Sequence, residues 1–64
     1  MQKYHETISI VLIHELECTG IVESLGAYAS KIKYIIDGVE HEDVFDNEDF
    51  SILEEITFTH IEDN

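Results

Sequence analysis

The sequence predicts an all-β fold of five short strands, with one short helical turn before the last strand. Three features support this prediction: an isoleucine- and valine-rich run near the N-terminus, an Asp-Gly pair between two extended runs, and alternation of apolar and polar residues near the C-terminus. The 64 residues suffice for one domain only, because the smallest domains that fold alone have about 55–65 residues. We therefore expect residues 1–64 to form a single domain.

The first two strands are expected near residues 6–16 and 19–26. The run from Thr7 to Leu16 has apolar residues at both even and odd positions, which is typical of a strand buried largely on both faces. The second run is short and apolar, and it is bounded by Gly20 and Gly26. We interpret it as a strand as well.

A β-hairpin is expected next, with strands near residues 30–37 and 39–45. Asp37-Gly38 suits the positive φ angles of a two-residue type I′ turn. Counting outward from this turn places Ile36 opposite Val39, Tyr34 opposite His41, and Lys33 opposite Glu42. The last pair predicts a cross-strand ion pair, which is worth no more than about 1 kcal/mol when exposed.

The end of the hairpin and the last strand have their own signals. Val39 and Val44 lie on opposite parities, which predicts a bulge or an early strand end near Asp43. Asp46 or Asn47 can cap a single helical turn before Phe50. A strand near residues 52–61 follows, with Ile56 and Phe58 on one face and Thr57, Thr59 and Ile61 on the other.

An α+β fold with a helix at about residues 19–36 is the alternative. Five apolar residues in this segment have helical spacing and would form one stripe: Ile21, Leu25, Tyr28, Ile32 and Ile35. Against a helix, Gly26 would lie in its middle at a cost of about 1 kcal/mol relative to alanine, and many residues of the segment are β-branched. Strands are therefore favoured.

Four short motifs between Gly20 and Glu55 follow the strand order of a known type of small barrel. They are Gly20-Ile21-Val22, Lys33-Tyr34 leading into Asp37-Gly38, Glu42-Asp43-Val44, and Asp49-Phe50 ahead of Leu53-Glu54. This part of the chain resembles the Tudor and KOW branch of the SH3-like barrels. The resemblance implies a five-stranded SH3-like barrel that acts as an interaction module. The chain departs from nucleic-acid-binding members in having no base after Lys33, and most of its aromatic residues are better explained as core than as a methyl-reading cage.

Charge is distributed unevenly along the chain. The formal net charge is −12, and the half from residue 34 onward holds eleven acids and no base. The hydrophobic content of 44% is nevertheless too high for an acidic disordered tail, so the chain should fold. The single cysteine, Cys18, allows no internal disulfide, and no leader or membrane-spanning pattern is present. These features predict a cytoplasmic protein.

The sequence offers little for catalysis or for metal binding. The four histidines lack the spacing of known zinc motifs, and Cys18 stands beside the unfavourable charge of Glu17. Acid–base catalysis needs a pocket that separates the pKa values of two groups, whereas side chains fill the interior of so small a barrel. We expect no enzyme activity, no cofactor and no metal site. Direct binding to nucleic acid is not expected either, because a charge of −12 repels a polyanion. No membrane partner is expected, because no apolar stretch is long enough to span a bilayer.

The acidic C-terminal half is the candidate functional surface. Its residues are Glu40, Glu42, Asp43, Asp46, Glu48 and Asp49, joined by Glu54 and Glu55. A negative face of this kind can dock on a basic surface of a nucleic-acid-handling protein and block it. In size and charge the chain is similar to acidic phage-encoded inhibitors, which implies an anti-restriction or anti-CRISPR role. The alternative is a small structural or assembly subunit that oligomerises through strand edges or apolar surface around Tyr4, Tyr28 and Phe45.

Overall fold

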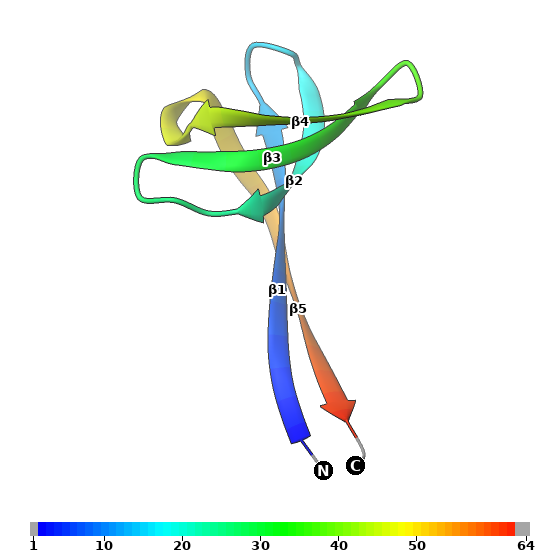
Figure 1. Ribbon diagram of the computed structural model, residues 1–64. Coiled ribbons are helices and arrows are strands. Elements are labelled where there is room, and N and C mark those ends of the chain that lie inside the picture. The colour runs from blue at the N-terminus through cyan, green and yellow to red at the C-terminus, as the bar shows by residue number, and fades with distance from the viewer. Residues whose placement is uncertain (1, 63–64) are drawn as a thin grey trace.

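The computed structural model describes residues 2–62, and the strands in this range form one antiparallel sheet in the order β4-β3-β2-β1-β5 (Figure 1). The elements are β1 (Gln2–Ile13), β2 (Cys18–Ser24), β3 (Ala29–Ile36), β4 (Val39–Asp46), the 3-10 turn η1 (Asn47–Asp49) and β5 (Phe50–Glu62). The predicted all-β fold with a helical turn before the last strand is confirmed. The helix considered for residues 19–36 is wrong, since this segment forms β2, a loop and β3.

The sheet is curled but is not closed into the barrel that the sequence led us to expect. β4 and β5 are its two edges, and within residues 2–62 they are not paired with each other. Two backbone hydrogen bonds of η1 connect it to the loops instead: the Asn47 N–H donates to the Tyr28 carbonyl at 2.8 Å, and the Asp49 carbonyl accepts from the His14 N–H at 2.9 Å. The barrel stays open because much of β5 lies against β1, away from β4.

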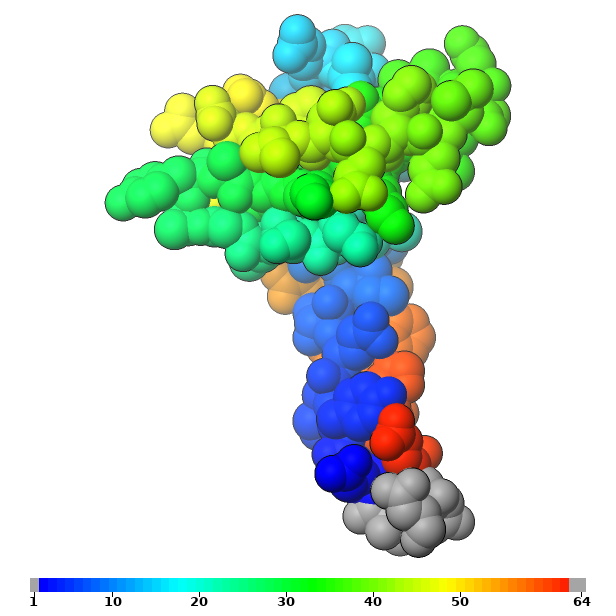
Figure 2. Space-filling view, in the orientation of Figure 1, coloured from blue at the N-terminus to red at the C-terminus, as the bar shows by residue number. Residues whose placement is uncertain are grey.

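β1 and β5 extend beyond the other strands as a two-stranded ribbon, which we call the stalk. It consists of residues 2–9 of β1 paired with residues 55–62 of β5, so the start of β1 and the end of β5 meet at its tip (Figure 1). The rest of the molecule forms a broader head (Figure 2). The radius of gyration is 13.8 Å, compared with about 11 Å for a compact chain of this length. The stalk therefore makes the molecule elongated.

The first strand differs from its prediction in both position and burial. β1 covers Gln2–Ile13 instead of residues 6–16, and residues 14–17 form a turn in which Glu17 has a φ of 51°. Residues 2–7 are exposed, and only Val11 and Ile13 are buried. The strand is thus not buried on both faces. Its odd-numbered side chains reach the core only from residue 10 onward, where β2 also pairs with β1.

The core is small and lies entirely in the head. Its buried apolar side chains are Val11, Ile13, Ile32, Tyr34 and Phe50, with Cys18, Val22, Ile36 and Phe45 packed around them. Ser30 is the buried polar residue of the described chain, and its hydroxyl is hydrogen bonded. Complete burial of a large apolar side chain contributes about 1.5–3 kcal/mol. Few side chains therefore carry the stability of the whole molecule.

Gly20 allows the sheet to curl tightly around this core. A Cβ atom at this position would lie 2.7 Å from Cγ2 of Ile32 and 2.8 Å from the carbonyl oxygen of Lys33. Both distances are shorter than real Cβ contacts, so any side chain here would push β2 away from β3. The glycine is required by close approach of the two strands.

The hairpin has the predicted register. Ile36 pairs with Val39, Tyr34 with His41 and Lys33 with Glu42, and both turn residues have positive φ angles, 52° at Asp37 and 79° at Gly38. The bulge or early strand end expected near Asp43 is wrong, because β4 runs in regular register to Asp46. A regular strand cannot bury both of its valines, and here both remain exposed, at 57% for Val39 and 64% for Val44.

The turn before the last strand is placed as expected. Asp46 occupies the N-cap position of η1, although its side chain makes no capping hydrogen bond. In β5, Ile56 pairs with Ile8 and Phe58 with Glu6, whereas Thr57 pairs with Thr7. The predicted division of β5 into two faces is therefore confirmed.

Candidate functional site

Six of the eight predicted acidic residues lie on β4 and η1. We call this set, Glu40, Glu42, Asp43, Asp46, Glu48 and Asp49, the acidic edge, because β4 is an edge strand of the sheet. All six side chains are exposed. Their proximity follows directly from the sequence, since they are six of ten consecutive residues in an extended strand and a single tight turn.

The pleat of β4 divides these carboxylates between two faces. Asp43 is paired with the buried Ile32, so it lies on the core side of the sheet. Glu42 pairs with Lys33 and Asp46 with Ala29, and they lie on the opposite side. The acidic edge is therefore a strip that surrounds one border of the sheet, rather than a flat anionic face.

Two lysines of β3 partly neutralise the strip near the hairpin turn. Lys31 Nζ lies 3.3 Å from Glu42, and Lys33 Nζ lies 4.0 Å from Glu40 and 3.7 Å from Glu23. The predicted Lys33–Glu42 ion pair is therefore wrong, although these residues are directly opposed. Because each of these pairs is largely exposed, it contributes about 0–1 kcal/mol. The excess negative charge is left at the other end of the strip.

Asp43 is held in place by a core residue. The hydroxyl of Tyr34 donates a hydrogen bond to its carboxylate, and the Tyr34 ring packs against His41 at 5.2 Å and edge-on against Phe45 at 5.8 Å between centroids. The hydrogen bond to Asp43 and, second, desolvation raise the pKa of Tyr34 from 10.0 to about 12. Tyr34 thus connects the acidic edge to the core.

The remaining two predicted residues, Glu54 and Glu55, do not join the acidic edge. They lie on β5, at the other edge of the strand order, and pair with Ile10 and Ser9 of β1. Neighbouring residues of a strand point to opposite faces, so these two carboxylates also diverge from each other. The eight predicted residues are therefore not one patch.

Histidines and cysteine are distributed over the molecule. The imidazole of His14 is hydrogen bonded to Ser51 at 2.6 Å, and that of His60 to Glu6 at 3.0 Å. Cys18 is free and half-buried against the core. Among residues 2–62 no three histidine, cysteine, aspartate or glutamate side chains lie close enough together to hold a metal ion.

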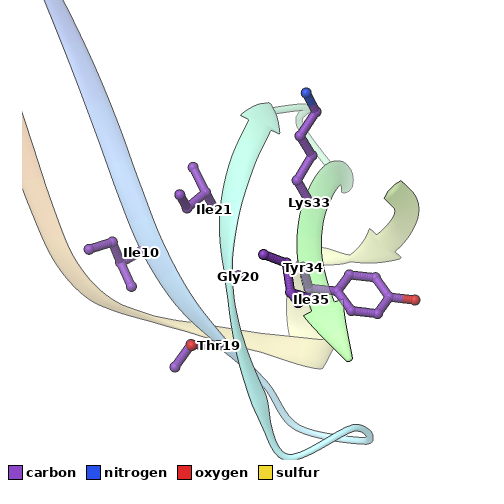
Figure 3. Close-up of a pocket in the computed structure, with 7 residues that line it drawn as sticks. All are labelled: Ile10, Thr19, Gly20, Ile21, Lys33, Tyr34 and Ile35. Atoms are coloured by element: carbon purple, nitrogen blue, oxygen red, sulfur yellow. The ribbon is translucent and has the colours of Figure 1, made fainter. Parts of the chain in front are cut away.

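A shallow groove lies on the outer face of β1, β2 and β3, and sequence reasoning did not find it. It has a volume of about 320 Å³ and is lined mainly by Ile10, Thr19, Ile21, Lys33 and Ile35 (Figure 3). Ile21 and Ile35 are exposed there, at 47% and 66%. The even-numbered apolar residues of β1 could have indicated an apolar outer face. They do not show which residues of β2 and β3 lie beside them.

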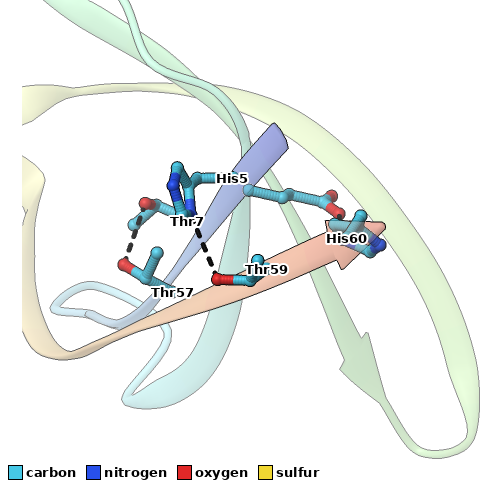
Figure 4. Close-up of polar contacts among 6 residues, drawn as sticks. His5, Thr7, Thr57, Thr59 and His60 are labelled. Carbon is cyan, nitrogen blue, oxygen red and sulfur yellow. Dashed lines mark hydrogen bonds and ion pairs between the residues drawn. The ribbon is translucent and has the colours of Figure 1, made fainter. Parts of the chain in front are cut away.

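The stalk presents one largely polar face and one face of mixed apolar and charged side chains. Its polar face carries hydrogen bonds between Thr7 and Thr57 and between His5 and Thr59, each of 3.1 Å (Figure 4). The other face carries Tyr4, Ile8, Ile56 and Phe58, but also Gln2, Glu6, His60 and Glu62, and the Tyr4 ring is stacked on His60 at 4.8 Å between centroids. The apolar side chains of the ribbon therefore lie mainly on one face, among polar ones.

None of the helical structure in residues 2–62 has the length and apolar character needed to cross a membrane. Comparisons of the chain with protein-family models, with curated proteins and with solved structures find no match.

Proposed function

We propose that this chain is a non-enzymatic, cytoplasmic interaction module whose acidic edge docks on a basic surface of a nucleic-acid-handling protein and blocks it. The observation that supports this proposal is the exposure of six carboxylates on one strand and turn at the border of the sheet. Only two of them, Glu40 and Glu42, have a lysine within 4.0 Å. The anti-restriction or anti-CRISPR role remains the specific form of this proposal.

The charge spacing determines how such docking works. Along the extended residues 40–46 of β4, Glu40, Glu42, Asp43 and Asp46 give one charge per about 6 Å, whereas duplex DNA carries one per about 1.7 Å of its axis. The strip is therefore too sparse to imitate a duplex along its length. It suits a local basic cluster, toward which long-range attraction steers the chain and speeds association.

A second candidate function is assembly through strand edges or apolar surface. Among residues 2–62, twelve large apolar side chains are exposed: Tyr4, Leu16, Ile21, Leu25, Tyr28, Ile35, Val39, Val44, Ile52, Leu53, Phe58 and Ile61. The three residues named for this role from the sequence do not form one patch, because Tyr4 belongs to the stalk, Tyr28 to the loop before β3, and Phe45 packs on the core. The stalk is the better surface for assembly.

The docking proposal is tested by reversing charges at the unneutralised end of the strip. A tagged chain captures its partner from a cell lysate, the partner is eluted by a salt step, and its affinity is then measured for two triple variants. Asp46→Lys, Glu48→Lys and Asp49→Lys should weaken binding about 100-fold, since three lost charge contacts of about 1 kcal/mol each amount to about two factors of ten.

The matched control makes the same charge change elsewhere. Glu15→Lys, Glu55→Lys and Glu62→Lys also alter three exposed acids and bring the net charge from −12 to −6. Binding through the acidic edge predicts a loss below about tenfold for this control. Equal losses for the two variants would show that overall charge, and not the strip, attracts the partner.

A further inference from the structure

The free edge of β5 is the longest unpaired backbone edge in the described chain. β5 has 13 residues and pairs only with β1, so its other side has no strand beside it. An edge strand presents unpaired N–H and C=O groups that can pair with another strand. Proteins usually protect such an edge with charges, prolines or bulges.

The two edges of this sheet differ in that protection. Half of the eight residues of β4 are acids, namely Glu40, Glu42, Asp43 and Asp46. A second β4 laid against the first would bring carboxylates together on both faces. The segment from Ile56 to Ile61 in β5 contains no carboxylate and no proline. Charge repulsion therefore opposes pairing of β4 with a second β4, whereas this segment of β5 carries no such protection.

We propose that β5 pairs antiparallel with β5 of a second copy, about a two-fold axis at Thr57. The two five-stranded sheets then form one continuous sheet of ten strands, with β4 at both ends. Because the two β4 edges repel further copies, assembly stops at the dimer.

The side chains of β5 fit one another in this register. Ile56 lies opposite Phe58 of the partner subunit, and Thr57 lies opposite Thr57 of the partner subunit. Glu54 lies opposite His60 of the partner subunit, which places a carboxylate against an imidazole. Aromatic–β-branched and threonine–threonine pairs are favourable when directly opposed across an antiparallel ladder.

Neighbouring registers fit less well. An axis at Phe58 places Glu54 opposite Glu62 of the partner subunit, and directly opposed like charges destabilise a ladder. An axis at Ile56 places Glu54 opposite the ring of the partner's Phe58. The Thr57 axis brings no two carboxylates into direct opposition.

Pairing of β5 with β5 of a second copy also gives the two-stranded stalk additional neighbouring strands. Two strands alone are marginally stable in water, whereas three or more with an apolar face are stable. The dimer turns two ribbons into four adjacent strands, β1-β5-β5-β1. On one face it joins the apolar side chains of both copies, of which Tyr4 is 46% and Phe58 44% exposed as a monomer. Repulsion between two chains of net charge −12 opposes this pairing, so salt should strengthen it.

The test is sedimentation velocity of the full chain over a concentration series, at about 20 mM and about 500 mM NaCl. We expect a monomer–dimer equilibrium whose dissociation constant falls with salt. Thr57→Lys and Thr57→Glu each place like charges at the axis and should weaken the dimer tenfold or more, while an equimolar mixture of the two variants should dimerise again. Thr57 is exposed, so circular dichroism should show both variants folded.

Thr7→Lys is the matched control. Thr7 is the cross-strand partner of Thr57, and its replacement breaks the same hydrogen bond and adds the same charge, but on β1. This variant should dimerise like the unmodified chain. As a second measurement, the amides of residues 56–61 should exchange more slowly with solvent as protein concentration rises.

The proposal is overturned if the unmodified chain stays monomeric at about 1 mM in high salt, if the mixture of Thr57 variants fails to dimerise, or if Thr7→Lys weakens the dimer equally. Its outcome does not depend on the proposed docking function. Charge reversal at Asp46, Glu48 and Asp49 leaves the β5 pairs unchanged, and salt acts on the two associations in opposite directions.

Discussion

Tyr34 contributes to the core and also forms a hydrogen bond with a carboxylate of the acidic edge. Its ring belongs to the small core, while its hydroxyl reaches the Asp43 carboxylate on the neighbouring strand. Deprotonation of the phenol would remove its hydrogen bond to Asp43 and would also place two negative charges in contact. The proton is therefore held more tightly in the folded chain, and the pKa of Tyr34 rises to about 12.

This pKa predicts how stability changes at high pH. The raised value means that the Tyr34 contribution is complete below pH 10.0 and is lost as the pH rises through about 12. In Asp43→Asn the acceptor charge is removed, so the pKa of Tyr34 should fall toward 10.0. An ultraviolet absorbance titration in a background of Tyr4→Phe and Tyr28→Phe isolates this phenol. An unchanged pKa in Asp43→Asn would show that burial alone raises it.

Pairs of residues could be predicted from the sequence only where the chain itself fixes their geometry. The turn at Asp37-Gly38 determines which residues of β3 and β4 are opposed, and the structure agrees. The ion pairs of Lys33 could not be predicted in the same way. Its long side chain reaches diagonally to Glu40 on β4 and to Glu23 on β2, and the position of β2 depends on contacts distant in sequence.

At the scale of the elements, η1 is attached to the head by Asn47. Its side-chain oxygen accepts a 2.7 Å hydrogen bond from the buried Ser30 hydroxyl, and its amide donates to the Gly26 carbonyl at 3.0 Å. The Ser30 oxygen in turn accepts from the Gly26 N–H at 3.3 Å. This network joins η1 to the loop between β2 and β3. These two segments are not strands, so no strand pairing holds them together.

Removing the side chain of Asn47 should weaken the attachment of η1 to the loop between β2 and β3. Asn47→Ala leaves the buried Ser30 hydroxyl without its acceptor and the Gly26 carbonyl without its donor, so the free energy of unfolding should fall by about 1–3 kcal/mol. Urea denaturation measures this change. Glu48→Ala, on the same turn but exposed, should stay within about 0.5 kcal/mol. Equal effects of the two variants would contradict the anchoring role of Asn47.

The strands with strong local patterns were predictable, and the stalk was not. β5 alternates clearly, and its two faces were assigned correctly. The first residues of β1 are largely polar and have no such pattern, so their strand exists only because residues 55–62 lie beside them. A strand that forms only beside a partner far away in the sequence leaves no local signal.

At the scale of the whole molecule, the sequence predicts the number and type of elements but not the open sheet. Whether five strands close depends on how far β1 and β5 run together, which no local motif specifies. The same limit applies to the candidate site. Six acids adjacent in sequence stay adjacent in the fold, whereas Glu54 and Glu55 are separated from them by the path of the chain.

A net charge of −12 on so small a core predicts a salt-dependent stability. Carboxylates repel one another more strongly in the folded state than in the expanded chain, so NaCl up to about 0.5 M should raise the midpoint of thermal unfolding by several degrees. Measurements at low protein concentration separate this effect from dimerisation. Near the sequence pI of about 4.3 the same salt should have little effect. A midpoint of thermal unfolding that does not change with salt at neutral pH would contradict the prediction.

The pairing of Gln2 with Glu62 has a consequence for the time course of folding. A ribosome makes β1 before β5, so the outer half of β1 waits for a partner strand that is made much later. Loops this long are slow to close, which places stalk formation late and makes folding as a whole slow. β3 and β4, joined by two residues, can pair long before that, and the newly made chain passes through a stage in which the hairpin is present and the N-terminal strand is still unpaired.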